Sequence, residues 1–436
     1  MRNKTFLDRS RAAVWHPCTQ MKQHESLPLV PIARGSGMWL YDFDGNRYLD
    51  AISSWWVNLF GHCNPRINAA LKDQLEKLEH VILSGFTHEP VIQLSERLSK
   101  LVPGNLGHCF YGSDGASAVE IALKMSFHAW RNNGKPGKTA FVSLQNSYHG
   151  ETLGALSVTD VALFKDTYAP LLRNSVQVPT PDWRYAAAGE THEAFALRCA
   201  ESLENHLSKQ HEKTAALILE PLVQGAAGMG MYHPIYLKRA REICDRYEVH
   251  LIADEIAVGF GRTGTMFACE QAGIAPDFLC LSKGITGGYL PLSVVMTHND
   301  IYQAFYDEDV TRGFLHSHSY TGNALACRAA LATLDIFEQD KVIEANRAKA
   351  VFMNETLNEL REHPRVKNLR NTGMIWAFEV ENAAQDFSKH FYLKALEREL
   401  LLRPIGNTVY FMPPYIISEE EMTLLVDRTL EIIKEL

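Results

Sequence analysis

The stretch Leu251-Ile-Ala-Asp254-Glu255 carries a short apolar run into a carboxylate, and Phe278-Leu-Cys-Leu281-Ser-Lys283-Gly284 carries a second run into a lysine. Short apolar runs bounded by polar residues or glycine are typical of strands buried in a parallel sheet. The chain between the two runs is long enough for a crossover to a neighbouring strand. We therefore expect Asp254 and Lys283 at the carboxyl edge of one sheet, where open α/β folds bind ligands.

Outward from these runs, strand-like and helix-like segments alternate. The run before Asp254 covers residues 249–253, and further apolar runs occupy residues 140–144 and 215–219. Helical spacing of apolar residues covers residues 64–83 and 116–130. This alternation predicts an α/β domain with a mixed, mostly parallel sheet flanked by helices.

The pattern of strand-like and helix-like segments changes after about residue 330. We expect helices at residues 326–337, 341–363 and 388–401, and strands at residues 366–370, 375–380 and 409–411. These segments predict a smaller α+β domain, which the short strands expected near the N-terminus join. The predicted organisation is an N-terminal segment (1–60) that belongs to the small domain, a large domain (61–330) and the rest of the small domain (331–436).

Composition narrows the possible classes of protein. The 436 residues carry a formal charge of −8 without a clustered basic segment, which argues against nucleic-acid binding. The eight cysteines form no C-x-x-C pair, so neither a zinc site nor a disulfide framework is expected. Neither a signal peptide nor an apolar run long enough for a membrane helix is present. We expect a cytoplasmic protein without metal.

A lysine and a carboxylate at one sheet edge meet the needs of pyridoxal 5′-phosphate. The amine of Lys283 can form a Schiff base with the cofactor, and Asp254 can keep the pyridinium nitrogen protonated so that the ring accepts electrons. When a substrate displaces it, Lys283 can move the proton as an acid and base. Either residue alone would be explained as a structural or solvated charge. The pair predicts an enzyme that works on amino groups.

Three further motifs fit this chemistry, although each has a simpler explanation. Tyr111-Gly-Ser-Asp114-Gly115-Ala116-Ser117 opens a predicted helix whose free N–H groups suit a phosphate, or it is merely a helix cap. In Asn146-Ser-Tyr148-His149-Gly150-Glu151, the tyrosine can stack on a flat ring or belong to the core. Arg403, seven positions before Tyr410, can grip a substrate carboxylate or lie on the surface.

Two nucleotide-binding patterns are misleading. Gly259-Phe-Gly-Arg-Thr-Gly264 matches G-x-G-x-x-G, but no clear helix opens from it. Gly137-Lys-Thr139 resembles the end of a P-loop, but Asn132 stands where that loop needs glycine. A nucleotide-dependent oxidoreductase or ATPase is thus disfavoured, and purified protein that stays colourless with added pyridoxal phosphate would favour it.

With these motifs in place, the chain resembles the fold-type I pyridoxal-phosphate enzymes, and among them the class III (ω-)aminotransferases. The similarity runs from Trp15-His-Pro to Tyr410-Phe-Met-Pro-Pro-Tyr415, nearly the whole chain. Its most specific pieces are Ser53-Ser-Trp-Trp56, the segment from Asp254 to Gly264, and the segment from Arg403 to Tyr410. Within the family the chain is most similar to members that act in biotin synthesis.

The resemblance implies a role for each motif residue. Lys283, Asp254 and Tyr148 would be catalytic, with Tyr148 stacked on the ring and Gly115 and Ala116 at the phosphate. Members of the family are homodimers with shared sites, so His318 and Ser319 would reach the phosphate bound by the partner subunit. The residues near the substrate would be Trp55, Tyr148, Arg262, Lys283, Ser317, Arg403, Tyr410 and Cys18, the last in place of the usual tyrosine.

The implied reaction is a ping-pong transfer of an amino group to 8-amino-7-oxononanoate. Its amino donor is S-adenosylmethionine or L-lysine, and His316-Ser-His-Ser-Tyr320 looks more like the lysine-using members. Ala116 and Glu151 replace the more common serine and aspartate. A broader ω-aminotransferase acting on diamines or ω-amino acids would share every cofactor residue, and it is the alternative.

Overall fold

The computed structural model describes residues 2–436, which divide into two compact units. Unit 1 combines the chain up to Asn68 with residues 348–370 and 375–436, and unit 2 combines residues 69–347 with 371–374. The boundaries predicted from the sequence, after residues 60 and 330, lie 8 and 17 residues before those of the two units. Between residues 2 and 436, every helix is too short or too polar to span a membrane.

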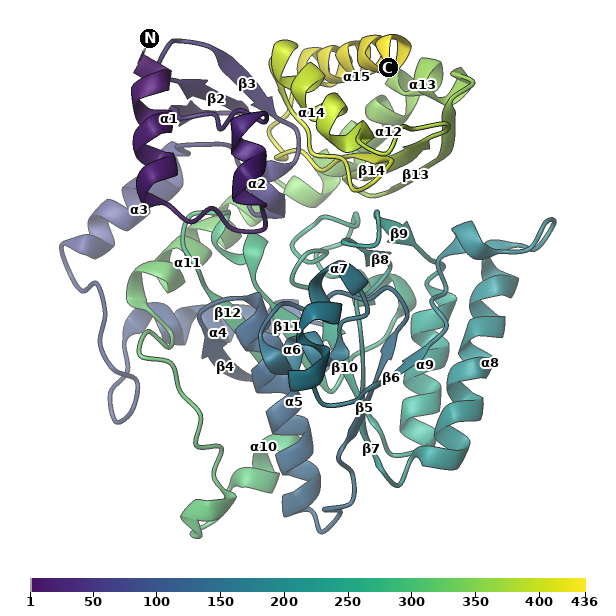
Figure 1. Ribbon diagram of the computed structural model, residues 1–436. Helices are drawn as coiled ribbons and strands as arrows, with labels where there is room; N and C mark the ends of the chain where they lie inside the picture. The colour runs from purple at the N-terminus through teal and green to yellow at the C-terminus, as the bar shows by residue number, and fades with distance from the viewer. Residues whose placement is uncertain (1) are drawn as a thin grey trace. The chain divides into compact units, whose positions relative to one another are not determined.

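Unit 2 contains a seven-stranded sheet in the order β4-β12-β11-β10-β7-β5-β6 (Figure 1). β12 is antiparallel to both of its neighbours, and the remaining strands are parallel, which confirms a mixed, mostly parallel sheet. The strands are β4 His108–Gly112, β5 Ala140–Leu144, β6 Val176–Val178, β7 Thr214–Leu219, β10 His250–Asp254, β11 Phe278–Leu281 and β12 Ser293–Thr297.

Helices cover the sheet because its strands are apolar on both faces. Every residue of β7 and β11 is buried. One face packs on α5 (Gly115–Asn132), whose small residues Ala118 and Ala122 allow close approach, while α9 contacts β10. The other helices of unit 2 are α4 Glu89–Leu101, α6 Leu153–Val158, α7 Ala162–Lys165, α8 His192–Gln210, α9 Ile235–Arg246, α10 Asn299–Phe305 and α11 Ala324–Gln339. A short hairpin pairs β8 Val223–Gln224 with β9 Gly230–Met231.

Unit 1 is an α+β assembly with two small sheets. One has the order β1-β2-β3-β15 and the other β13-β14-β16, so strands from both ends of the chain share a sheet. The strands are β1 Ile32–Ser36, β2 Trp39–Asp42, β3 Arg47–Asp50, β13 Val366–Thr372, β14 Ile375–Val380, β15 Leu400–Leu401 and β16 Thr408–Phe411. The helices are α1 Arg2–Ala13, α2 Ser53–Trp56, α13 Asn358–Glu362, α14 Phe387–Glu397 and α15 Glu419–Glu435.

Three helix predictions were wrong in extent. The helix expected over residues 64–83 is α3, Pro65–Leu75, because the side chain of Gln74 donates to the carbonyl of Leu78 at 2.7 Å and closes the last turn. The helix expected over residues 341–363 is broken at Leu357 into α12, Val342–Thr356, and α13. In residues 388–401 the helix ends at Glu397, because Leu400–Leu401 pairs with β3 as β15.

An ionic cluster ties the amino ends of β10 and β11 together. The Asp277 carboxylate accepts hydrogen bonds from Arg241 at 2.8 Å and from the backbone N–H of Leu251 at 2.6 Å, and it lies 3.3 Å from His298 Nε2. Burial alone would raise the pKa of Asp277, but the hydrogen bond of His298 and the charge of Arg241 outweigh it and lower the pKa. The ionised carboxylate therefore stabilises the fold.

We expect Asp277→Asn to lower the free energy of unfolding by about 3 kcal/mol at neutral pH, since it leaves buried donors facing a neutral amide. A lowered folded-state pKa gives stability that is full above the unfolded value, about 3.9, and is lost as the pH falls below it. The gap between wild type and variant should therefore shrink below about pH 4, as measured by denaturant unfolding at several pH values. An equal gap at all pH values would contradict this account.

Candidate active site

The polar residues of interest follow the carboxyl ends of parallel strands in unit 2. In a parallel sheet these ends meet at one edge, so the residues gather although they are distant in sequence. The residues directly beyond these strand ends include Gly115 after β4, Tyr148 and His149 after β5, Glu220 after β7, Asp254 at the end of β10, and Lys283 after β11. The sheet edge therefore brings together the lysine and the carboxylate that the sequence singled out.

Asp254 is buried and lies within hydrogen-bond distance of a histidine. His149 Nδ1 lies 2.7 Å from Asp254 Oδ2, and the backbone N–H of Ile256 donates to Asp254 Oδ1 at 3.1 Å. Both Asp254 and His149 are almost inaccessible to solvent. The contact fixes the carboxylate in one orientation. Sequence reasoning assigned no role to His149, although it adjoins Tyr148.

Lys283 begins the short 3₁₀ turn Lys283–Thr286, directly after β11, with a left-handed backbone (φ 45°). Its pKa is lowered because burial disfavours the charged amine, an effect that the nearby carboxylates of Asp254 and Glu220 oppose. The preceding residue, Ser282, donates through Oγ to the carbonyl of Leu292 at 2.7 Å, which holds the strand end. A lysine with a lowered pKa is a better nucleophile near neutral pH.

Glu220 is a second buried carboxylate that sequence reasoning missed. Its Oε1 accepts the backbone N–H of Tyr148 at 2.9 Å and its Oε2 accepts that of Gly225 at 3.0 Å. Burial raises the pKa of Glu220 to about 7, with His149 lowering it and Asp254 raising it. The rule that found Asp254, a carboxylate after a buried strand, applies equally to Glu220 and would have found it.

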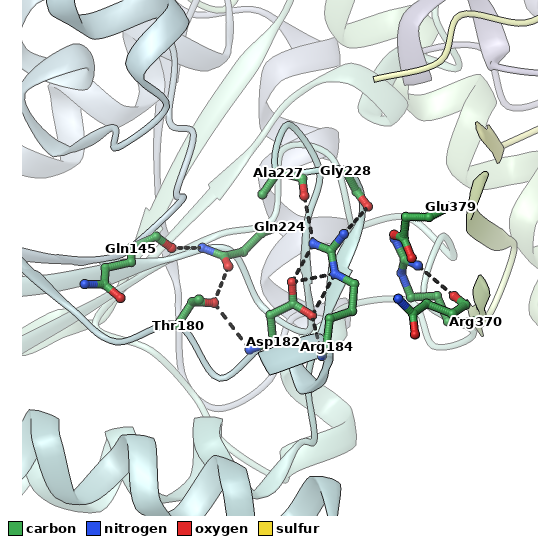
Figure 2. Close-up of polar contacts among 10 residues, drawn as sticks. Gln145, Thr180, Asp182, Arg184, Gln224, Ala227, Gly228, Arg370 and Glu379 are labelled. Atoms are coloured by element: carbon green, nitrogen blue, oxygen red, sulfur yellow. Dashed lines mark hydrogen bonds and ion pairs between the residues drawn. The ribbon is translucent and has the colours of Figure 1, made fainter. Parts of the chain in front are cut away.

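A polar network holds the loop that follows Glu220 (Figure 2). The Arg184 guanidinium binds Asp182 at 2.5–3.1 Å and donates to the carbonyls of Ala227 at 2.8 Å and Gly228 at 3.4 Å. Gln224 is held on the same loop, donating to the carbonyl of Gln145 at 3.0 Å and accepting from the hydroxyl of Thr180 at 2.5 Å. These contacts fix the loop, and they therefore also fix Gly225, whose backbone N–H donates to Glu220.

The start of α5 offers a close approach to a ligand. Asp114 caps the helix and accepts the backbone N–H of Ser117 at 2.9 Å. A Cβ at Gly115 would lie 2.9 Å from Ile256, and one at Gly150 would lie 2.6 Å from the Cβ of Ala116, so both glycines stand where a side chain would crowd its neighbours. Free N–H groups at this helix start suit a phosphate.

The remaining predicted residues of unit 2 lie as follows. The Tyr148 hydroxyl donates to Glu151 at 2.8 Å, and its ring packs edge-on against Phe164. His318 Nδ1 lies 3.0 Å from Ser113 Oγ of the same chain, whereas Ser317 and Ser319 are exposed. Arg262 is buried, and its carbonyl accepts the backbone N–H of Met374 at 2.8 Å.

The other predicted substrate residues belong to unit 1. The Arg403 guanidinium lies 5.3 Å from the ring centre of Trp55, and both side chains are exposed. Tyr410 is buried, and its hydroxyl accepts from Trp56 Nε1 at 3.1 Å. Burial raises the pKa of Tyr410 to about 12, so the phenol stays neutral. Cys18 is exposed.

The residues at the sheet edge fit pyridoxal phosphate. Lys283 supplies an amine with a lowered pKa, Asp254 a buried carboxylate in fixed orientation, and the glycine-lined start of α5 an anion site. Among residues 2–436, no group of three or more histidine, cysteine, aspartate or glutamate side chains could hold a metal ion.

Comparison with known proteins gives one consistent family. The model of the aminotransferase class-III family matches residues 20–433. An adenosylmethionine-8-amino-7-oxononanoate aminotransferase of Helicobacter pylori is 51% identical over 97% of this chain and 96% of its own. The crystal structure of the enzyme with that name from Methanocaldococcus jannaschii has a TM-score of 0.93 and 37% identity over 99% of both chains. An (S)-enantioselective omega-transaminase from Thermomicrobium roseum has a TM-score of 0.95 and 30% identity, covering 99% of this chain and 98% of that one.

Proposed function

The chain belongs to the class III aminotransferases, which are pyridoxal-phosphate enzymes, and from this premise we propose that it aminates 8-amino-7-oxononanoate to 7,8-diaminononanoate, a step of biotin synthesis. The single observation that carries the substrate is the 51% identity, over nearly the whole chain, to a relative of that name. S-adenosylmethionine is the proposed amino donor, because that relative is named for it. The reaction proceeds in two half-reactions at one site.

Each residue of the sheet edge has a task in this proposal. When bound, pyridoxal phosphate supplies a carbon that exchanges amino groups and a ring that accepts electrons from the substrate. Lys283 Nζ would hold that carbon and, once a substrate displaces it, would move the proton at the substrate Cα. Asp254 would keep a proton on the ring nitrogen, and His149 holds the Asp254 carboxylate in its orientation. Gly115 and Ala116 bind the phosphate, and Tyr148 covers the ring.

The proposed substrate residues provide a charged end and an apolar wall. Arg403 binds a carboxylate, and the ring of Trp55 beside it lines the path of the substrate's hydrocarbon chain. The remaining proposed contacts are Tyr410, Arg262, Ser317 and Cys18. Arg403 and Trp55 together can therefore recognise a substrate with a carboxylate at one end and an apolar chain behind it.

A cytoplasmic homodimer is the proposed form of the enzyme. Large apolar side chains are exposed on and near the loop that carries His318 and Ser319, with Leu315 at 77% and Tyr320 at 66% exposure. Such side chains mark protein contact surfaces, and a second copy placed there would bring His318 and Ser319 to the phosphate of its partner. All eight cysteines are free thiols, which suits a reducing compartment.

The visible spectrum of the pure holoenzyme tests the donor. We expect S-adenosylmethionine, added without an acceptor, to bleach the visible absorbance of the bound cofactor. The reason is that the donor half-reaction alone converts the aldehyde form of the cofactor, which absorbs there, to its amine form. Bleaching by L-lysine instead would replace the proposed donor. If simple ω-amino acids or diamines bleach it and 8-amino-7-oxononanoate does not restore it, the chain is a broader ω-aminotransferase and the proposed acceptor is wrong.

A further inference from the structure

The turn Ser53–Trp56 of unit 1 is wound in the left-handed sense. Its four residues have φ of 53°, 45°, 73° and 73°, and the N–H groups of Trp56 and Val57 donate to carbonyls four residues back, at 2.9 and 3.0 Å. Non-glycine residues avoid this conformation because Cβ approaches the following carbonyl oxygen too closely. The turn therefore persists only because its surroundings hold it.

A buried carboxylate at the end of β3 holds the turn. Asp50 has no exposed surface. Its Oδ1 accepts the backbone N–H of Ser54 at 2.9 Å, and its Oδ2 accepts the Ser54 hydroxyl at 2.6 Å. His62 Nε2 lies 3.0 Å from the same Oδ2. The carboxylate thus joins the second residue of the turn to a histidine eight positions further along the chain.

His62 is itself fixed on several sides. Asn58 Nδ2 donates to His62 Nδ1 at 3.2 Å, which directs the Nε2–H toward Asp50. The backbone of His62 exchanges two hydrogen bonds with that of Gly37, at 2.7 and 3.1 Å. A Cβ at Gly35 would lie 2.5 Å from the Cβ of His62, so β1 passes directly against the histidine. The histidine is a rigid support for the carboxylate.

The left-handed turn sends its two tryptophans in different directions. Trp55 points outward, 48% exposed, with the Arg403 guanidinium over its ring. Trp56 is buried and donates to the Tyr410 hydroxyl. A right-handed turn would place both side chains elsewhere. The strained turn therefore places Trp55 against Arg403 and Trp56 against Tyr410, two of the proposed substrate residues.

We propose that Asp50 and His62 are positioning residues for the acceptor: they hold the left-handed turn that presents Trp55 as the platform for Arg403. This inference rests on the proposed function, because it takes Trp55 and Arg403 as substrate contacts. Neither Asp50 nor His62 touches the substrate. Their effect reaches it through Ser54 and the backbone of the turn.

The test uses the full-length holoenzyme and 8-amino-7-oxononanoate. We expect His62→Gln to raise KM for this acceptor about 10- to 100-fold, since small misplacements of a substrate contact cost this much, while cofactor affinity measured by absorbance titration stays within about twofold. Ser54→Ala removes one bond to Asp50 from an exposed residue and should cause a smaller change in the same direction. His390→Gln, which removes an exposed histidine–aspartate pair of unit 1, should leave KM unchanged.

A double variant separates positioning from general damage. If His62 acts through Trp55, adding His62→Gln to Trp55→Ala should raise KM no further than Trp55→Ala does alone. Multiplying effects, or an unchanged KM in both His62→Gln and Ser54→Ala, would overturn the inference while leaving the proposed function intact. An unchanged KM in Trp55→Ala would instead remove Trp55 from the substrate site, and both the proposed contact and the inference would fall.

Discussion

Lys283→Ala is expected to slow amino transfer by at least about 10⁴-fold, because one side chain both anchors the cofactor carbon and moves the proton. Lys283 is placed for this by the end of β11 and has a pKa lowered by burial. The variant should still fold, since alanine is smaller than lysine and leaves no amine to be buried. Stopped-flow absorbance after adding the donor measures the rate directly.

Lys138→Met provides a matched control for this variant. Lys138 is also buried, and its pKa is lowered to about 8, chiefly by burial. Its Nζ donates to the carbonyls of His211 and Thr214, next to the amino end of β5 and thus at the opposite edge of the sheet. Lys138→Met should lower stability and spare the rate of transfer. Turnover of Lys283→Ala within about tenfold of wild type would remove Lys283 from its proposed role.

Asp254→Asn is expected to slow both half-reactions by about 10³-fold, because a neutral amide cannot hold a proton on the ring nitrogen by charge. His149→Gln removes only the support of the carboxylate and should slow them by about 10- to 100-fold. Both variants are measured by single-turnover absorbance with donor and with acceptor separately.

The two changes at Asp254 and His149 should not multiply when combined, since both act through one carboxylate. Asp277→Asn, which disturbs a buried carboxylate at the opposite edge of the sheet, should cost stability and leave the half-reactions near their normal rates. A rate for Asp254→Asn equal to that of the wild type would contradict the proposed pairing with the ring nitrogen.

The sheet could be predicted from the sequence because buried parallel strands are short, apolar and bounded. Residues 140–144, 278–281 and 375–380 were predicted with the bounds that the structure has. Helix ends were less predictable, because non-local partners decide them. Leu400–Leu401 has helical spacing with the preceding residues, but β3, from the other end of the chain, captures it as a strand.

The site divides in the same way. Asp254 and Lys283 could be found because each ends an apolar run, a local signal. The contact of His149 with Asp254 could be recognised only from the structure, because it depends on β5 and β10 ending at the same edge of the sheet. The link from Asp50 to His62 likewise depends on the left-handed turn, which the sequence does not indicate. A single sequence indicates which residues lie at strand ends, but it does not indicate which of these residues contact one another in the fold.

The pairing of β15 with β3 also bears on how the chain is made. β3 emerges early from the ribosome, whereas its parallel partner follows about 350 residues later. At a synthesis rate of about 5–20 residues per second, the edge of β3 that pairs with β15 has no partner strand for roughly 20–70 s. Unpaired strand edges invite association with other chains. The charged residues Arg47 and Asp50 of this short strand are therefore suited to a nascent chain that must remain unpaired until synthesis is nearly complete.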